Sequence, residues 1–135
     1  VDLVPKAIRE DRKANVKVLA VADGEVITCY PPPGAVGHTK AGKKFIFPGH
    51  PIYGGLLVIK HWDDKQKMYC YSLYGHFKEI WVTEHTMVKA GQPLGLVGST
   101  GRSTGPHLHF AIYYDPLDVI NSAIMAQKKK NWLGF

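Results

Sequence analysis

The stretch of residues 101–110 constrains the fold of this chain more than any other. Its first half consists mainly of turn-forming residues, and His107 and His109 follow at positions i and i+2. Alternate side chains of a β-strand point to one face, so a strand that begins abruptly here projects both imidazoles together. Leu108 and Phe110 would then be buried behind them. Packing gives no reason to place two imidazoles on one strand face, whereas a metal ion with an activated water does.

A third histidine, His76, lies in another strand-like run. A lone His-x-His pair is more often exposed surface than a metal site, and a third histidine in a strand changes that balance. If a sheet brings His76 beside His107 and His109, the groove gains one metal ligand and two groups that can move a proton. One more histidine and one carboxylate would still be needed.

Short strand-like runs separated by turn residues fill most of the chain, which has 14 Gly and 9 Pro among its 135 residues. We expect strands over residues 16–21 and 25–30, joined as a hairpin around Asp23-Gly24. Residues 56–61 and 67–77 are expected to form a second hairpin. The pattern predicts a single domain, residues 1–135, that is mainly β with a small antiparallel sheet.

Three segments lie outside these strands. Residues 1–15 are expected to form a short extended piece and then a solvated loop. Residues 31–55 are rich in Pro and Gly and predict a long loop with a short strand over residues 44–47, and long loops of this kind are more often functional than decorative. Beyond Asp115-Pro116, apolar residues recur at helical spacing and predict a C-terminal helix over residues 117–128.

The long loop also carries side chains of interest. His38 and His50 are expected to be exposed loop residues rather than metal ligands. The aromatic residues of the loop either line one wall of a groove or, as we favour, pack the loop down. These are Phe45, Phe47 and Tyr53.

The formal net charge of +6 favours an anionic partner, such as a cell-wall polymer, a membrane surface or a nucleic acid. The one basic run beside an aromatic residue, 128–132, is interpreted as a solvated helix end, which argues against nucleic-acid binding. No apolar run approaches the roughly 20 residues of a membrane span. The chain opens on Val1 with no signal peptide, as expected of a processed form or a fragment. Cys29 and Cys70 lack Cys-x-x-Cys spacing, and both a disulfide and two free thiols remain open.

Three blocks of sequence, read together, carry a family resemblance. They are residues 74–77 (Tyr-Gly-His-Phe), residues 88–101 and residues 103–110, the last containing Gly-Pro-His-Leu-His after Ser-Thr. In order, spacing and turn residues they resemble the lysostaphin-like peptidoglycan endopeptidases, the LytM-type domain. Residues 18–26 are similar to the first core hairpin of that family. The match covers residues 16–30 and 56–112, and the Gly-Pro-His-Leu-His motif is highly specific.

The resemblance implies a small antiparallel β fold with an open groove and one zinc ion. It implies hydrolysis of peptide cross-links in bacterial cell-wall peptidoglycan, outside the cytoplasm: in the periplasm, in the cell envelope or after secretion. On the family pattern His109 is a metal ligand, and His107 orients or deprotonates the zinc-bound water. His76 polarises the substrate carbonyl or stabilises the oxyanion. No substrate-binding residue is assigned.

One departure lies at the front of the chain, where the first thirty residues contain no His-x-x-x-Asp. Residues 1–3 (Val-Asp-Leu) are similar to the tail of that early metal motif, with its histidine falling upstream of residue 1. Asp2 is therefore the candidate second zinc ligand, and an exposed terminal aspartate is the alternative. The alternative function is a degenerate or metal-poor LytM-type module that binds wall peptides or a protein partner as a scaffold or activator.

Overall fold

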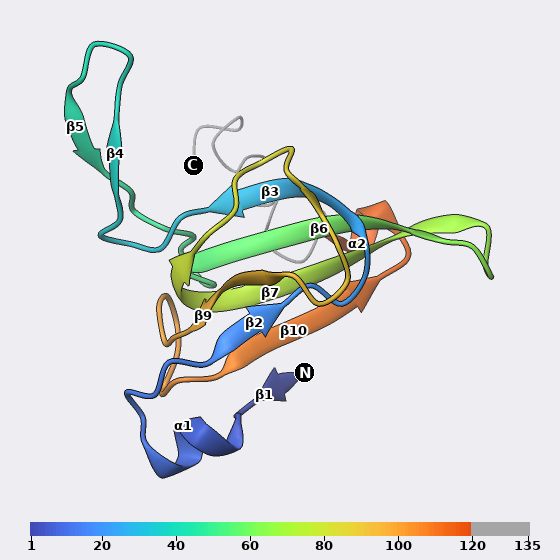
Figure 1. The fold of residues 1–135 in the computed structure, drawn as a ribbon, viewed down its shortest axis with the longest axis horizontal. Coiled ribbons are helices and arrows are strands. Elements are labelled where there is room, and N and C mark those ends of the chain that lie inside the picture. Colours follow the sequence, from blue (N-terminus) through green and yellow to red (C-terminus); the bar gives the residue numbers. More distant parts are fainter. Residues whose placement is uncertain (120–135) are drawn as a thin grey trace.

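Antiparallel sheet dominates the computed structural model, which describes residues 1–119 (Figure 1). The helices are α1 (Lys6–Glu10) and α2 (Pro116–Val119). The strands are β1 (Asp2–Leu3), β2 (Lys17–Leu19), β3 (Gly24–Tyr30), β4 (Val36–His38), β5 (Lys44–Ile46), β6 (Gly55–Asp63), β7 (Met68–Ile80), β8 (Met87–Val88), β9 (Pro93–Val97) and β10 (Leu108–Tyr113). The main sheet has the order β1-β10-β7-β6-β3-β8, with β9 linking β2 to β7. The prediction of a mainly β fold with a small antiparallel sheet is confirmed.

The centre of the sheet is buried on both faces, because β6 carries an uninterrupted apolar run. Leu57 and Ile59 pack in one cluster, and the alternate residues Leu56 and Val58 pack in a second cluster. A strand covered on both sides needs such a run rather than polar alternation. Val119 of α2 belongs to the second cluster, so this helix packs against that face.

A chain of hydrogen bonds satisfies the polar side chains buried beside this core. The Nδ1–H of His61 donates to the Asp23 carbonyl at 2.8 Å, which leaves Nε2 to accept from the Ser72 hydroxyl at 2.6 Å. The Ser72 oxygen lies 3.0 Å from the Tyr74 hydroxyl, which accepts from the Val21 N–H. The side chains of β6 and β7 are thereby tied to the segment that leads into β3.

The two strands predicted to pair around Asp23 and Gly24 do not form a hairpin. Instead β2 pairs with β9, and β3 pairs with β6 and β8. The Asp23 carboxylate accepts from the Ala90 N–H at 2.8 Å, and a Cβ on Gly24 would lie 2.4 Å from the Lys60 carbonyl oxygen. These close contacts direct the chain across to β6 rather than back along β2. The second predicted hairpin, β6 with β7, is confirmed.

The segment predicted as a solvated loop after residue 5 begins instead with α1. Ile8 is buried in the core, and its N–H donates to the Pro5 carbonyl at 3.0 Å. Proline is tolerated where a helix starts, because the N–H that it lacks has no partner within the helix there. Burial of one apolar side chain thus outweighs a weak local signal over five residues.

The long loop is partly ordered. The strand predicted over residues 44–47 is present as β5, and it pairs with β4, which the sequence did not predict. Figure 1 shows this hairpin projecting away from the main sheet. The predicted C-terminal helix begins with α2, and the rest of residues 117–128 lies outside the described residues.

Two further predictions can be compared with the structure. Cys29 and Cys70 are free thiols on different strands. Within residues 1–119, no helix has the length and apolar character required to cross a bilayer.

Candidate functional site

His76 sits where β7 is irregular. The register of β7 shifts against β6 on one side and against β9 on the other, and His76 itself has φ of 68°. A left-handed backbone at a residue with a side chain costs about 1 kcal/mol or more and persists only where the surroundings hold it. Here its N–H donates to the Tyr53 carbonyl at 2.8 Å. Its ring Nδ1 bonds the Thr100 carbonyl at 2.6 Å, which fixes the direction of the side chain.

The start of β10 brings the other two histidines to the same place. His109 pairs with Gly75 of β7, and His107 forms a bridge with Gly98 just before β10 begins. The ring of His76 lies 4.7 Å from that of His107 and 6.1 Å from that of His109, measured between centroids. The three imidazoles expected from the sequence therefore converge on one surface.

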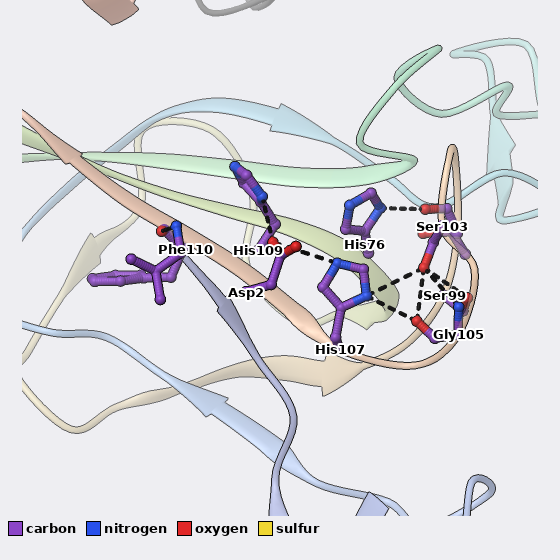
Figure 2. Close-up of polar contacts among 10 residues, drawn as sticks. Asp2, His76, Ser99, Ser103, Gly105, His107, His109 and Phe110 are labelled. Atoms are coloured by element: carbon purple, nitrogen blue, oxygen red, sulfur yellow. Dashed lines mark hydrogen bonds and ion pairs between the residues drawn. The ribbon is translucent and has the colours of Figure 1, made fainter.

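Asp2 reaches this surface because β1 pairs with β10, in a register that sets Asp2 opposite His109. Its Oδ1 lies 2.9 Å from Nδ1 of His109 and 3.6 Å from Nε2 of His107. Figure 2 shows the carboxylate between the two rings. The hydrogen bond from His109 lowers the pKa of Asp2 below its usual value. Asp2 is thus an exposed residue whose carboxylate contacts both histidines, and its role as a zinc ligand stays a prediction.

Backbone carbonyls decide which ring nitrogens carry protons. The Nδ1 atom of His107 lies 2.8 Å from the Gly105 carbonyl, an arrangement like that of His76 with Thr100. A carbonyl only accepts, so each Nδ1 is the donor, and Nε2 of each neutral ring keeps its lone pair. Burial lowers the pKa of His76, which keeps that ring neutral near pH 7. His76 therefore presents a proton acceptor at Nε2, and His107 presents one whenever its ring is neutral.

Tyr53 forms a wall of this groove, whereas the sequence favours a role for this residue in packing the long loop. Its ring lies 5.0 Å from that of His109 and 5.8 Å from that of His76. It comes this close because Gly75 has no side chain: a Cβ there would lie 2.9 Å from Tyr53 Cδ1. Burial raises the pKa of the Tyr53 hydroxyl. The groove has a volume of about 500 Å³.

The structure agrees with some of the remaining predictions for the long loop and contradicts one of them. Phe45 and Phe47 pack against each other with ring centroids 4.9 Å apart, as favoured. His38 is exposed, as expected. His50 is not exposed: only 3% of its surface is accessible, and its Nδ1 accepts from the N–H groups of residues 52 and 53 at 3.1 Å. His50 thereby holds the segment that carries Tyr53.

Two glycines lock that segment against the loop before His107. Gly54 has φ of 60°, and a Cβ there would lie 2.4 Å from the carbonyl carbon of Thr100. Gly101 has φ of 74°, and its Cβ would lie 2.4 Å from the nitrogen of Gly54. The two loops pack backbone to backbone, which places the Thr100 carbonyl against His76. The sequence signals this only through the glycines, and it carries no sign that the carbonyls of residues 100 and 105 would orient imidazoles.

Two atoms of the site fit a metal ion. In a tetrahedral zinc site with bonds of 2.0–2.1 Å, neighbouring ligand atoms lie about 3.3 Å apart. Asp2 Oδ1 and His109 Nδ1, at 2.9 Å, need to separate only slightly to occupy two such positions. Within residues 1–119, no group of three or more His, Cys, Asp or Glu side chains is arranged to hold a metal ion.

Two known proteins illustrate the sequence similarity of this chain. The chain is 43% identical over 74 residues to the peptidoglycan DD-endopeptidase ShyB of Vibrio cholerae, covering 55% of this chain and 16% of ShyB. It is 40% identical over 76 residues to the murein hydrolase activator NlpD of Escherichia coli, covering 55% of this chain and 18% of NlpD. The chain thus spans less than a fifth of the length of these relatives.

Solved structures with the same fold include a zinc-containing peptidase from Vibrio cholerae, with a TM-score of 0.51 and 31% identity over 73% of this chain and 24% of that one. The catalytic domain of lysostaphin from Staphylococcus simulans has a TM-score of 0.52 over 80% of this chain and 72% of that one, and at 23% identity it supports the fold alone. Residues 6–122 match the sequence pattern of Peptidase family M23. The fold, the groove lined by three histidines and a match over most of the sequence agree: this chain belongs to peptidase family M23.

Proposed function

We propose that this chain is a zinc-dependent endopeptidase domain that hydrolyses peptide cross-links of bacterial peptidoglycan. The observation that carries the proposal is the convergence of Asp2, His76, His107 and His109 on one open groove. The similarity to a peptidoglycan DD-endopeptidase and to a zinc-containing peptidase supports the substrate class and the metal.

In this proposal Asp2 and His109 are two zinc ligands, through Oδ1 and Nδ1. When bound, zinc would polarise a carbonyl and lower the pKa of a water molecule. The pairing of β1 with β10 orients both ligand atoms before any metal binds, because it sets Asp2 and His109 opposite each other. The lowered pKa of Asp2 keeps its carboxylate ionised, as metal binding requires.

His107 accepts a proton from the attacking water at Nε2, because its Nδ1–H is already held by the Gly105 carbonyl. The same Nε2–H can then be delivered to the departing amine. His76 faces His107 across the groove and presents its own Nε2. A ring that is protonated on Nε2 can donate a hydrogen bond to an oxyanion. The proton taken from water can therefore serve this role on either His107 or His76.

A murein hydrolase activator is the second candidate function. The similarity to NlpD favours it. Such a module would use the same groove to bind wall peptides or a partner protein. Its imidazoles would take no part in hydrolysis.

The wider setting of the chain is part of the same proposal. We propose that residues 1–135 form one peptidase domain and that it acts outside the cytoplasm, in the periplasm, in the envelope or after secretion. The similarity to an outer membrane antigenic lipoprotein of Haemophilus influenzae supports this location. Peptidoglycan peptides are the proposed partners, and the net charge of +6 suits an anionic wall polymer.

The test compares the chain with His109→Ala and His107→Ala variants in excess zinc. Metal content and release of soluble peptides from purified peptidoglycan are measured together. We expect His109→Ala to lose both zinc and hydrolysis, and His107→Ala to keep zinc while hydrolysis falls about 100-fold or more. His38→Ala, at an exposed histidine, is the matched control. A chain that hydrolyses nothing but stimulates a separate murein hydrolase would overturn the endopeptidase and support the activator.

A further inference from the structure

The groove continues past His107 into a second lobe of about 380 Å³ on the side of α1. Asp2, Thr104 and His107 line both this lobe and the lobe that holds the other imidazoles. A peptide lying across the histidines therefore has a path to α1. Figure 1 shows α1 beneath the edge of the sheet formed by β1 and β10.

The second lobe is basic. Arg9 and Arg12 line it, and both are exposed. Arg12 lies over the loop that supports His107, since a Cβ built on Gly105 would come within 3.1 Å of its Nη2. The absence of a side chain at Gly105 leaves room for the guanidinium beside the groove.

Neither arginine pairs with a counterion within residues 1–119. In the part of the chain that the structure describes, the guanidinium groups of Arg9 and Arg12 form no ion pair and no hydrogen bond. Asp2 is the one acidic residue among those that line the two lobes, and its carboxylate is already hydrogen-bonded to His109. Ile8 and Pro106 give the lobe an apolar side, which suits the stem of a substrate side chain.

We propose that Arg9 and Arg12 form a subsite for a free carboxylate of the peptide substrate, close to the scissile amide on the α1 side. Guanidinium groups bind carboxylates through paired, charge-assisted hydrogen bonds, and two unpaired guanidinium groups at one groove wall favour an acidic ligand over its neutral amide. The inference rests on the proposed function, because it assumes that the groove receives a wall peptide. It adds the chemical class that the groove selects.

The experiment uses one soluble cross-linked peptide dimer in two forms, with its free carboxyl groups intact or converted to carboxamides. Binding of each form to the full chain in excess zinc is measured by titration calorimetry, and hydrolysis is followed separately. We expect the acid to bind about tenfold more tightly than the amide, and Arg9→Gln combined with Arg12→Gln to abolish this preference. Lys13→Gln removes one positive charge next to Arg12 outside the lobe and should keep the preference.

The possible results separate the two proposals. Equal binding of acid and amide, a preference that survives the double substitution, or no binding of either form overturns the subsite. If the wild-type chain hydrolyses both forms while binding them equally, the endopeptidase stands and the subsite fails. If it prefers the acid but hydrolyses neither form, the subsite stands and the endopeptidase fails. Unchanged thermal unfolding of the variants shows that the fold is intact.

Discussion

Replacing Gly54 by alanine should damage the candidate site through the backbone rather than through any catalytic side chain. Gly54 has φ of 60°, and a new Cβ would lie 2.4 Å from the Thr100 carbonyl carbon, about 1 Å inside ordinary contact. The loop of Thr100 must move by a similar distance, which withdraws its carbonyl from Nδ1 of His76. A displacement of about 1 Å at a positioned group can lower a catalytic rate about 100-fold.

Gly42→Ala is the matched control, because Gly42 also has a left-handed φ, 82°, but its Cβ would meet nothing within 4 Å. The left-handed backbone alone costs about 1–2 kcal/mol in each variant. Urea denaturation should show that loss for Gly42→Ala and a larger one for Gly54→Ala. Hydrolysis of purified peptidoglycan should fall about 100-fold for Gly54→Ala only. If Gly54→Ala hydrolyses peptidoglycan within threefold of the wild type, the Thr100 carbonyl does not position His76 for the reaction.

Three more predictions follow from the structure. Ser72→Ala removes two buried hydrogen bonds and leaves Nε2 of His61 without a partner, so it should lower the free energy of unfolding by about 2–4 kcal/mol in urea. Thr39→Ala, at an exposed residue, should change it by less than about 0.5 kcal/mol. Burial raises the pKa of Cys29 to about 11. In a Cys70→Ser background the alkylation rate of Cys29 should therefore rise about tenfold per pH unit from pH 8 to 10. A plateau of that rate near pH 9 would contradict this. Burial lowers the pKa of His76, so as the pH falls the unfolded chain takes up a proton near pH 6.5 before the folded chain does. The free energy of unfolding should therefore fall between pH 7 and pH 5. His76→Gln should make it depend less on pH over that range.

The parts of the site that could be predicted are those specified by residues close together in the sequence. The turn residues before His107 and the alternation of His107 and His109 specify where a strand starts and which side chains share a face. The fold of β6 onto β7 was likewise visible, because two apolar runs flank a polar turn at residues 63–65. Such signals depend on neighbours in the chain, which a sequence shows directly.

What could not be predicted depends on contacts between distant residues. The corner at Asp23 and Gly24 has the composition of a hairpin turn, yet its partners are Ala90 and Lys60, which no local pattern reveals. Tyr53 lines the groove because Gly75, on another strand, leaves space for its ring. The short helix α1 forms because its one buried side chain finds the core. Each outcome was decided by tertiary packing over local propensity.

The strand that carries Asp2 is only two residues long and lies at the outer edge of the sheet, paired to β10 alone. A competing segment that took its place along β10 would remove the carboxylate and the hydrogen-bond partner of His109. The rings of His76 and His107 would still be held by their backbone carbonyls. The position of the carboxylate therefore depends on one short edge pairing, whereas other elements position the imidazoles of His76 and His107.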